Sequence, residues 1–143
     1  MWDADTLKQM IEEVIPFNKF LGIRAKHIGE DGITLELPFQ EHFVGDPVRP
    51  ALHGGVMSTL ADVVGGLAVW SKVEDAHARV STIDMRVDYL RPGKLETLCA
   101  EGRVVRLGNR VGVTDMRLFH PSESQQTIAT GKGVYNITVR KSR

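Results

Sequence analysis

The sequence predicts an α+β domain in which one long helix packs against a curved antiparallel sheet. Residues 54–72 carry apolar side chains at helical spacing, which predicts the one long helix of the chain. The segments after this helix alternate apolar and polar side chains with a period of two, which predicts about four strands. Because a helix and a sheet each expose an apolar face, we expect the sheet to curve around the helix.

The segment before the long helix is expected to hold a short helix, a hairpin and a loop. "DADTLKQMIEEVI", within residues 1–15, predicts an amphipathic helix that Asp3 or Asp5 can cap and that Pro16 ends. "GIRAKHIG" and "GITLELPF" flank "EDG", which is typical of a β-hairpin. Residues 39–52 are expected to form a loop because turn residues crowd there: Gly45, Asp46, Pro47 and Pro50.

The long helix has two different faces. One is an apolar stripe that is expected to pack on the sheet: Val56, Met57, Leu60, Ala61, Val64, Leu67 and Ala68. The other is small and mostly polar: Gly55, Ser58, Thr59, Asp62, Gly65, Gly66 and Val69. Small side chains let a ligand or a partner helix approach closely, and Asp62 lies in the middle of this face.

The strands after the helix follow from alternation and turn signals. In "VSTIDMRVDYLRP", apolar residues alternate with polar ones from Thr82 to Tyr89, which predicts a half-buried strand that ends at Pro92. "LETLCAEGRVVRL" and "RVGVTDMRLFH" flank "GN" and form a second predicted hairpin. "QQTIATGKGVYNITVR" is the last predicted strand.

Length, charge and cysteine content limit the classes of protein to which the chain can belong. The 143 residues suit a single domain spanning 1–143. Lys plus Arg and Asp plus Glu both total 18, so the chain lacks the basic field of a general nucleic-acid binder. No apolar stretch approaches the ~20 residues of a membrane span, so no membrane partner is expected. The only cysteine is Cys99, and its lack of an intrachain partner fits a cytoplasmic protein best.

The helix combines an electrophilic start with a carboxylate. Gly54 and Gly55 fall in the first turn, where backbone N–H groups lack intrahelical partners and can stabilise an oxyanion. Asp62 could act as a base or a nucleophile. It lies eight residues beyond Gly54, which is ~12 Å along a helix, so one carbonyl cannot touch both groups. We therefore expect an antiparallel homodimer with active sites at its interface.

These residues match a family. "HGGVMSTLAD" resembles the HGG-x(6)-D signature of hotdog-fold acyl-CoA thioesterases of the phenylacetate-pathway type. "STIDMRVDYLRPG", "LGNR" and "IATGKGVYNI" are also similar, and the resemblance covers roughly residues 17–139. It implies a hotdog fold, dimers or dimers of dimers, and hydrolysis of acyl-CoA thioesters without a metal or an organic cofactor.

The resemblance also implies roles by position. Asp62 would be the base or nucleophile, and the Gly54 N–H would polarise the thioester carbonyl, with Gly55 beside it. His53 would shape this turn, and Thr82 would help to hold the attacking water. The CoA phosphates need cations near the site, for which the best candidates lie in two segments: Arg91, Pro92, Arg106, Gly108, Asn109 and Arg110.

Two alternatives stay open, and one segment departs from the family pattern. Many relatives carry Asn and Gly where this chain has Pro47 and Pro50. "HFVGDPVRPALHGG" is also similar to the loop of hotdog hydroxyacyl-thioester dehydratases, in which a loop histidine, here His42, pairs with an early helix carboxylate. Val56 occupies that carboxylate position, which disfavours a dehydratase. A non-catalytic acyl-CoA-binding module is the other alternative.

The acyl group stays undetermined by the sequence. An aromatic acyl group and a medium-chain fatty acyl group are equally open. The candidates for lining the acyl pocket are Phe39, Phe43, Val69 and Trp70.

Overall fold

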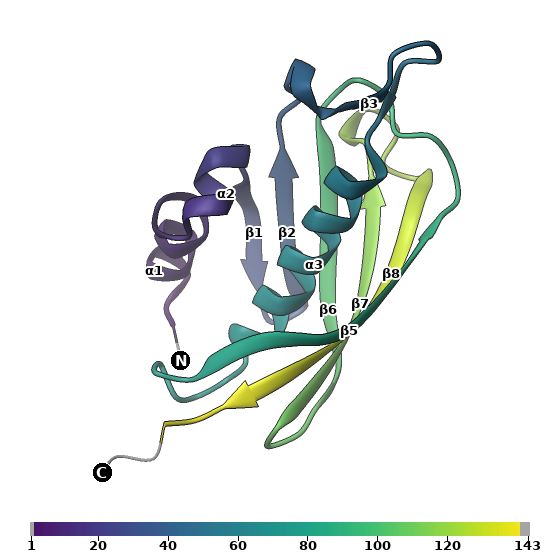
Figure 1. Ribbon diagram of the computed structural model, residues 1–143. Coiled ribbons are helices and arrows are strands. Elements are labelled where there is room, and N and C mark those ends of the chain that lie inside the picture. Colours follow the sequence, from purple (N-terminus) through teal and green to yellow (C-terminus); the bar gives the residue numbers. More distant parts are fainter. Residues whose placement is uncertain (1, 141–143) are drawn as a thin grey trace.

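A long helix, α3 (Gly54–Trp70), lies across one face of a six-stranded antiparallel sheet (Figure 1). The computed structural model describes residues 2–140. In their order across the sheet, the strands are β1 (Arg24–Gly29), β2 (Gly32–Leu37), β6 (Leu98–Leu107), β7 (Val111–Phe119), β8 (Thr127–Thr138) and β5 (Arg79–Tyr89). The predicted α+β architecture and both predicted hairpins, β1–β2 and β6–β7, are confirmed.

The N-terminal segment forms two short helices joined by a π-helical turn. They are α1 (Ala4–Gln9), η1 (Met10–Val14) and α2 (Pro16–Leu21). Asp3 caps α1 as predicted, because its Oδ1 accepts from the Thr6 N–H at 2.8 Å. Pro16 ends the first helical stretch but also begins α2, since proline is compatible with the first turn of a helix. Gly22 ends α2 in the left-handed conformation (φ 80°).

Residues 39–52 are not entirely loop. They contain a 3-10 turn, η2 (Glu41–Phe43), and two short paired strands, β3 (Val44–Asp46) and β4 (Ala51–Leu52). Asp46 Oδ1 accepts from the N–H groups of Val48 and Arg49 at 2.9 and 3.1 Å. The Asp46 carboxylate is therefore engaged in its own turn, and the proline-rich segment closes a small hairpin ahead of α3.

The sheet covers a wider arc of α3 than the predicted stripe. The stripe residues Met57, Leu60, Ala61, Val64, Leu67 and Ala68 are buried as predicted, and Val56 is half-buried. Val69 was predicted on the small polar face, but it is fully buried beside Tyr135 and Ile137. The reason is that the sheet curves around the helix, so that α3 contacts β2, β5, β6, β7 and β8.

Strand β5 forms one edge of the sheet. It pairs with β8 alone among the described strands, and its register shifts between Thr82 and Asp84. Its predicted apolar face is only partly buried, since Met85 and Val87 are half-buried whereas Ile83 is 57% exposed. The extra residue at this bulge twists the strand locally. The outer edge of β5 therefore presents unpaired backbone groups to other chains.

Candidate active site

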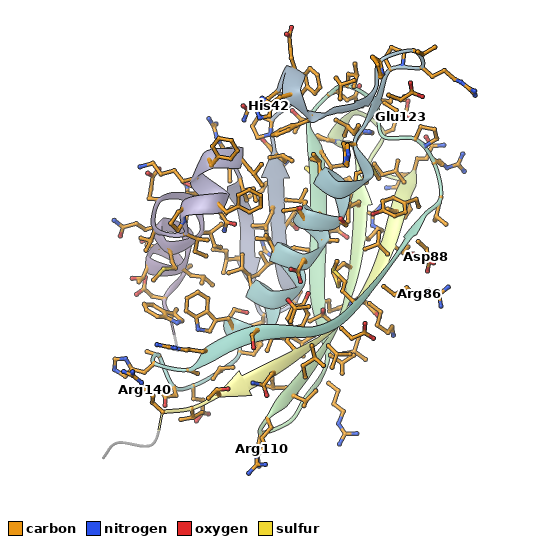
Figure 2. All side chains as sticks on the ribbon, viewed as in Figure 1. His42, Arg86, Asp88, Arg110, Glu123 and Arg140 are labelled. Carbon is orange, nitrogen blue, oxygen red and sulfur yellow. The ribbon has the colours of Figure 1, made fainter. Side chains whose placement is uncertain are left out.

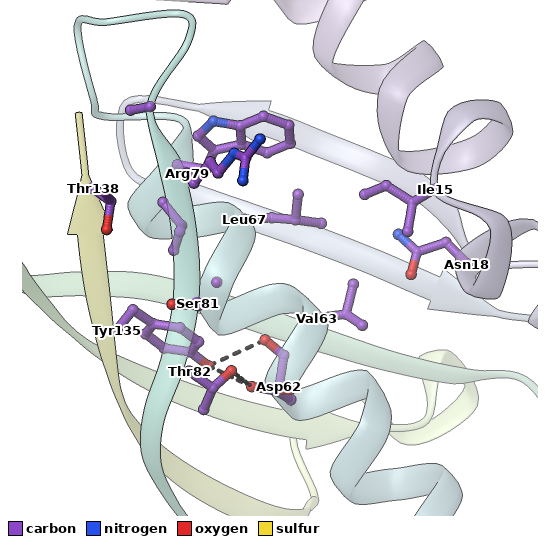
Figure 3. Close-up of a pocket in the computed structure, with 14 residues that line it drawn as sticks. Ile15, Asn18, Asp62, Val63, Leu67, Arg79, Ser81, Thr82, Tyr135 and Thr138 are labelled. Carbon is purple, nitrogen blue, oxygen red and sulfur yellow. Dashed lines mark hydrogen bonds between the residues drawn. The ribbon is translucent and has the colours of Figure 1, made fainter. Parts of the chain in front are cut away.

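Two hydroxyl groups converge on the carboxylate of Asp62 (Figure 3). Thr82 on β5 donates to Asp62 Oδ1 at 2.8 Å. Tyr135 on β8 donates toward the same oxygen at 3.2 Å and toward the Asp62 backbone carbonyl at 3.1 Å. Thr82 and Tyr135 are directly opposite each other in the antiparallel pairing, which places both side chains on the helix-facing side. One carboxylate oxygen is thus held, while Oδ2 accepts no hydrogen bond from residues 2–140.

The ring of Tyr135 passes through a space that glycines leave open. A Cβ atom on Gly65 of α3 would lie 2.3 Å from Tyr135 Oη, and one on Gly133 would lie 2.4 Å from the ring. A Cβ atom on Gly66 would lie 3.2 Å from the ring. The prediction that Gly65 and Gly66 thin the helix for a partner subunit is therefore wrong for Gly65, which is buried against Tyr135. These glycines let the tyrosine hydroxyl reach Asp62.

Tyr135 stays protonated over the whole ordinary pH range. Its burial, the negative charge of Asp62 and the hydrogen bond to Asp62 all raise the pKa of this hydroxyl. Tyr135 was not among the site residues predicted from the sequence. The available signal was a tyrosine on the final strand, two residues after "GKG", because a buried tyrosine hydroxyl normally needs a polar partner.

The raised pKa of Tyr135 predicts an alkaline effect on stability. The unfolded chain releases a tyrosine proton near pH ~10, whereas the folded protein retains it. The stability contributed by Tyr135 is therefore present below pH ~10 and is lost above it, by up to ~1.4 kcal/mol per pH unit. Tyr135→Phe should be less stable than the wild type at pH 8 and should lack this alkaline decline. Urea unfolding at several pH values up to ~11 measures both. Parallel stability curves for the two proteins would contradict the prediction.

A cavity of about 740 Å³ opens beside Asp62, between α2, α3 and β5 (Figure 3). It is lined mainly by Ile15, Asn18, Asp62, Val63, Leu67, Trp70, Arg79, Thr82 and Tyr135. Asn18 is only 2% exposed, and its side chain makes no hydrogen bond to any residue between 2 and 140. A buried amide without a partner costs about 1–3 kcal/mol, so this residue calls for a physical explanation. Of the predicted pocket residues, Trp70 lines this cavity, whereas Phe39, Phe43 and Val69 do not.

The first turn of α3 has its own set of contacts. His53 is the N-cap, and its Nδ1 accepts from the Gly55 N–H at 2.8 Å. Tyr89 on β5 donates to the Gly54 carbonyl at 3.0 Å. The Gly55 N–H is therefore occupied by His53 rather than open, while the Gly54 N–H has no acceptor within residues 2–140.

Gly54 and Asp62 face different hollows within one chain. Gly54 lines a depression of about 320 Å³ together with Tyr89, Arg91 and Pro92. Asp62 lines the larger cavity further along α3. This separation agrees with the ~12 Å expected from the helical rise, so a single chain does not bring the two groups to one carbonyl.

The predicted CoA-binding residues lie in two separate places. Arg91 and Pro92 are near the start of α3, and both also line a hollow that contains Glu123. Arg106, Gly108, Asn109 and Arg110 lie at the β6–β7 turn, and Figure 2 shows Arg110 at the opposite end of the sheet from Glu123. One chain therefore does not join these cations into a single phosphate site.

Within residues 2–140, no group of three or more His, Cys, Asp or Glu side chains could hold a metal ion. No helix in the same range is long and apolar enough to cross a membrane.

The thiol of Cys99 is buried, and this burial raises its pKa, so it is a poor nucleophile.

The arrangement of α3 across a curved antiparallel sheet places the protein in the hotdog class of α+β folds, as predicted. The chain belongs to the thioesterase superfamily, whose sequence profile matches residues 50–126. The prediction of a thioester hydrolase is thereby confirmed at the level of the family.

Known proteins similar to the chain agree with this membership. The medium/long-chain acyl-CoA thioesterase YigI of Escherichia coli is 33% identical over 86% of each chain. A Shewanella oneidensis protein of known structure, described as related to the thioesterase superfamily, is 33% identical, covers 94% of each chain and has a TM-score of 0.83. Thioesterase HI1161 of Haemophilus influenzae, at 22% identity and a TM-score of 0.80, supports the fold alone.

Proposed function

We propose that the protein hydrolyses acyl-CoA thioesters to a free acid and CoA, with medium- or long-chain acyl groups as the first candidates. The observation that carries this proposal is the Asp62 carboxylate, held by Thr82 and Tyr135 at the wall of a large cavity. The name of the 33% identical Escherichia coli relative supports the substrate class. The balanced charge and the absence of a membrane-spanning helix within residues 2–140 are compatible with a cytoplasmic location.

Asp62 supplies the reactive carboxylate. As a general base, it takes a proton from a water molecule that Thr82 helps to position, and the water oxygen attacks the thioester carbon. As a nucleophile, it attacks that carbon itself and forms a mixed anhydride, which water then hydrolyses. In both cases the carbonyl oxygen gains negative charge, the C–S bond breaks, and the CoA thiolate leaves and takes up a proton.

The oxyanion is stabilised by the Gly54 N–H of a partner subunit in this proposal. The separation of Gly54 from Asp62 along α3, ~12 Å by helical rise, supports a site that two chains share. The open edge of β5 and its exposed Ile83 offer a surface on which a second copy can pair, giving a homodimer or a dimer of dimers. Such pairing would bring cations from two chains near one substrate. Arg91 with Pro92, and the β6–β7 turn with Arg106, Gly108, Asn109 and Arg110, are the candidates for binding the CoA phosphates.

The dehydratase alternative has no comparable support. His42 contacts the rings of Phe20 and Phe43, and it makes no hydrogen bond to a carboxylate within residues 2–140. A hydration activity on an unsaturated acyl thioester that survives Asp62→Asn but not His42→Ala would favour this alternative.

A thiol-release screen tests the proposed function. Wild-type protein is assayed with short, medium, long and aryl acyl-CoA substrates, and the released CoA is detected with a thiol reagent. We expect saturable turnover with at least one of these classes, in the range typical of enzymes, about 1–10³ s⁻¹. Cys99 should not disturb the assay because its thiol is buried. Binding of acyl-CoA without thiol release from any substrate would instead indicate a binding module.

A further inference from the structure

The Asn18 amide is an unused polar group in an otherwise apolar part of the large cavity. It lies on α2 and faces the cavity opposite Val63 and Leu67 of α3 (Figure 3). Its side chain is 2% exposed and makes no hydrogen bond within the described residues. A leucine of similar size at this position would fill the same space and leave no amide unpaired. An asparagine here therefore points to a polar group that enters the cavity.

We infer that the cavity binds the acyl group of the substrate and that Asn18 selects an acyl group carrying a hydroxyl. This inference rests on the proposed acyl-CoA hydrolysis, because Asp62 lines the same cavity. Val63 and Leu67, which face Asn18, follow Asp62 by one and five residues. Asn18 therefore lies within ~8 Å of Asp62, measured along the axis of α3. An acyl chain that extends from a carbonyl at Asp62 into the cavity would pass this amide.

The chemistry of the amide favours a hydroxyl over other substituents. The amide nitrogen Nδ2 is buried without a hydrogen-bond partner, and the same amide carries a carbonyl oxygen, so the group offers N–H donors beside an acceptor. A hydroxyl can accept from the N–H and donate to the carbonyl, whereas an oxo group or a carboxylate can only accept. An unsubstituted chain would leave the amide nitrogen buried without a partner, and a site of this kind rejects the analogue that lacks the polar group.

The test compares decanoyl-CoA with 3-hydroxydecanoyl-CoA and 10-hydroxydecanoyl-CoA in the thiol-release assay. For the wild type we expect kcat/KM for at least one hydroxylated substrate to exceed that for decanoyl-CoA by about 10-fold or more. In Asn18→Leu this preference should disappear, because kcat/KM should rise for decanoyl-CoA and fall for the hydroxylated substrate. The same variant should raise Tm by about 2 °C or more, because it removes the unpaired amide.

Two further variants test whether the substrate preference depends on the Asn18 amide itself. Lys19→Leu makes a similar polar-to-leucine change on α2, but at an exposed side chain outside the cavity, and should leave the substrate preference unchanged. Asn18→Ala removes the amide without adding bulk and should also abolish the preference. Similar rates with all three substrates in the wild type, or a hydroxyl preference that persists in both Asn18 variants, would overturn the inference while leaving thioester hydrolysis intact. Absence of thiol release from all three would overturn it together with the proposed function.

Discussion

Replacing Asp62 with asparagine should lower kcat by about 10²–10⁴-fold, the range that a general base contributes, while the fold is retained. The amide has nearly the same shape as the carboxylate, and its oxygen can still accept from Thr82 and Tyr135. It cannot take a proton from water or form an anhydride. We therefore expect the loss in kcat rather than in KM, because substrate contacts outside the carboxylate are unchanged. Steady-state thiol release measures both constants.

Asp115→Asn is the matched control for this experiment. Asp115 lies on β7 and pairs with Lys132 at 2.9 Å, and its side chain is 46% exposed. Loss of such a surface pair costs about 0–1 kcal/mol of stability and should not change kcat. If Asp62→Asn retained wild-type kcat with an unchanged Tm, Asp62 would be neither the base nor the nucleophile.

Periodicity accounts for most of the fold that could be predicted. The helical spacing in residues 54–72 and the alternation in the later strands reflect burial on one face, which is a local property of the chain. The short β3–β4 hairpin was missed because its prolines mark turns, while its pairing depends on backbone contacts between Val44 and Leu52. The edge position of β5 depends on the order of strands in the sheet, which its own residues do not encode.

The candidate site could be predicted only where its residues form a motif. Gly54 and Asp62 lie on one helix at a fixed spacing, so the distance between them follows from helix geometry. Tyr135 lies 73 residues beyond Asp62, and its ring fits only because Gly65 and Gly133 meet around it. The occupied Gly55 N–H was also missed, because whether the His53 ring turns back onto the helix depends on its rotamer.

Gly54→Pro should lower kcat by about 10²–10³-fold, the effect of removing one oxyanion donor. Proline lacks the N–H and is tolerated at the first helical position, which Gly54 occupies. His53 already has the extended conformation that precedes proline (φ −61°, ψ 130°). A Cβ atom at position 54 would meet the Tyr89 ring at an ordinary 3.5 Å. Gly54→Ala keeps the N–H, so its kcat should fall far less, by no more than about 10-fold.

A mixed dimer of Gly54→Pro and Asp62→Asn chains distinguishes a shared site from a site within one chain. In a shared arrangement, one of its two sites combines the intact Asp62 of one chain with the intact Gly54 of the other. The second site carries both defects. The purified heterodimer should therefore recover about half of the wild-type kcat per dimer, although each parental homodimer is nearly inactive. A heterodimer no more active than its parents would show that Asp62 and Gly54 do not meet across the interface. Recovery can arise only if each subunit supplies the group that the other lacks.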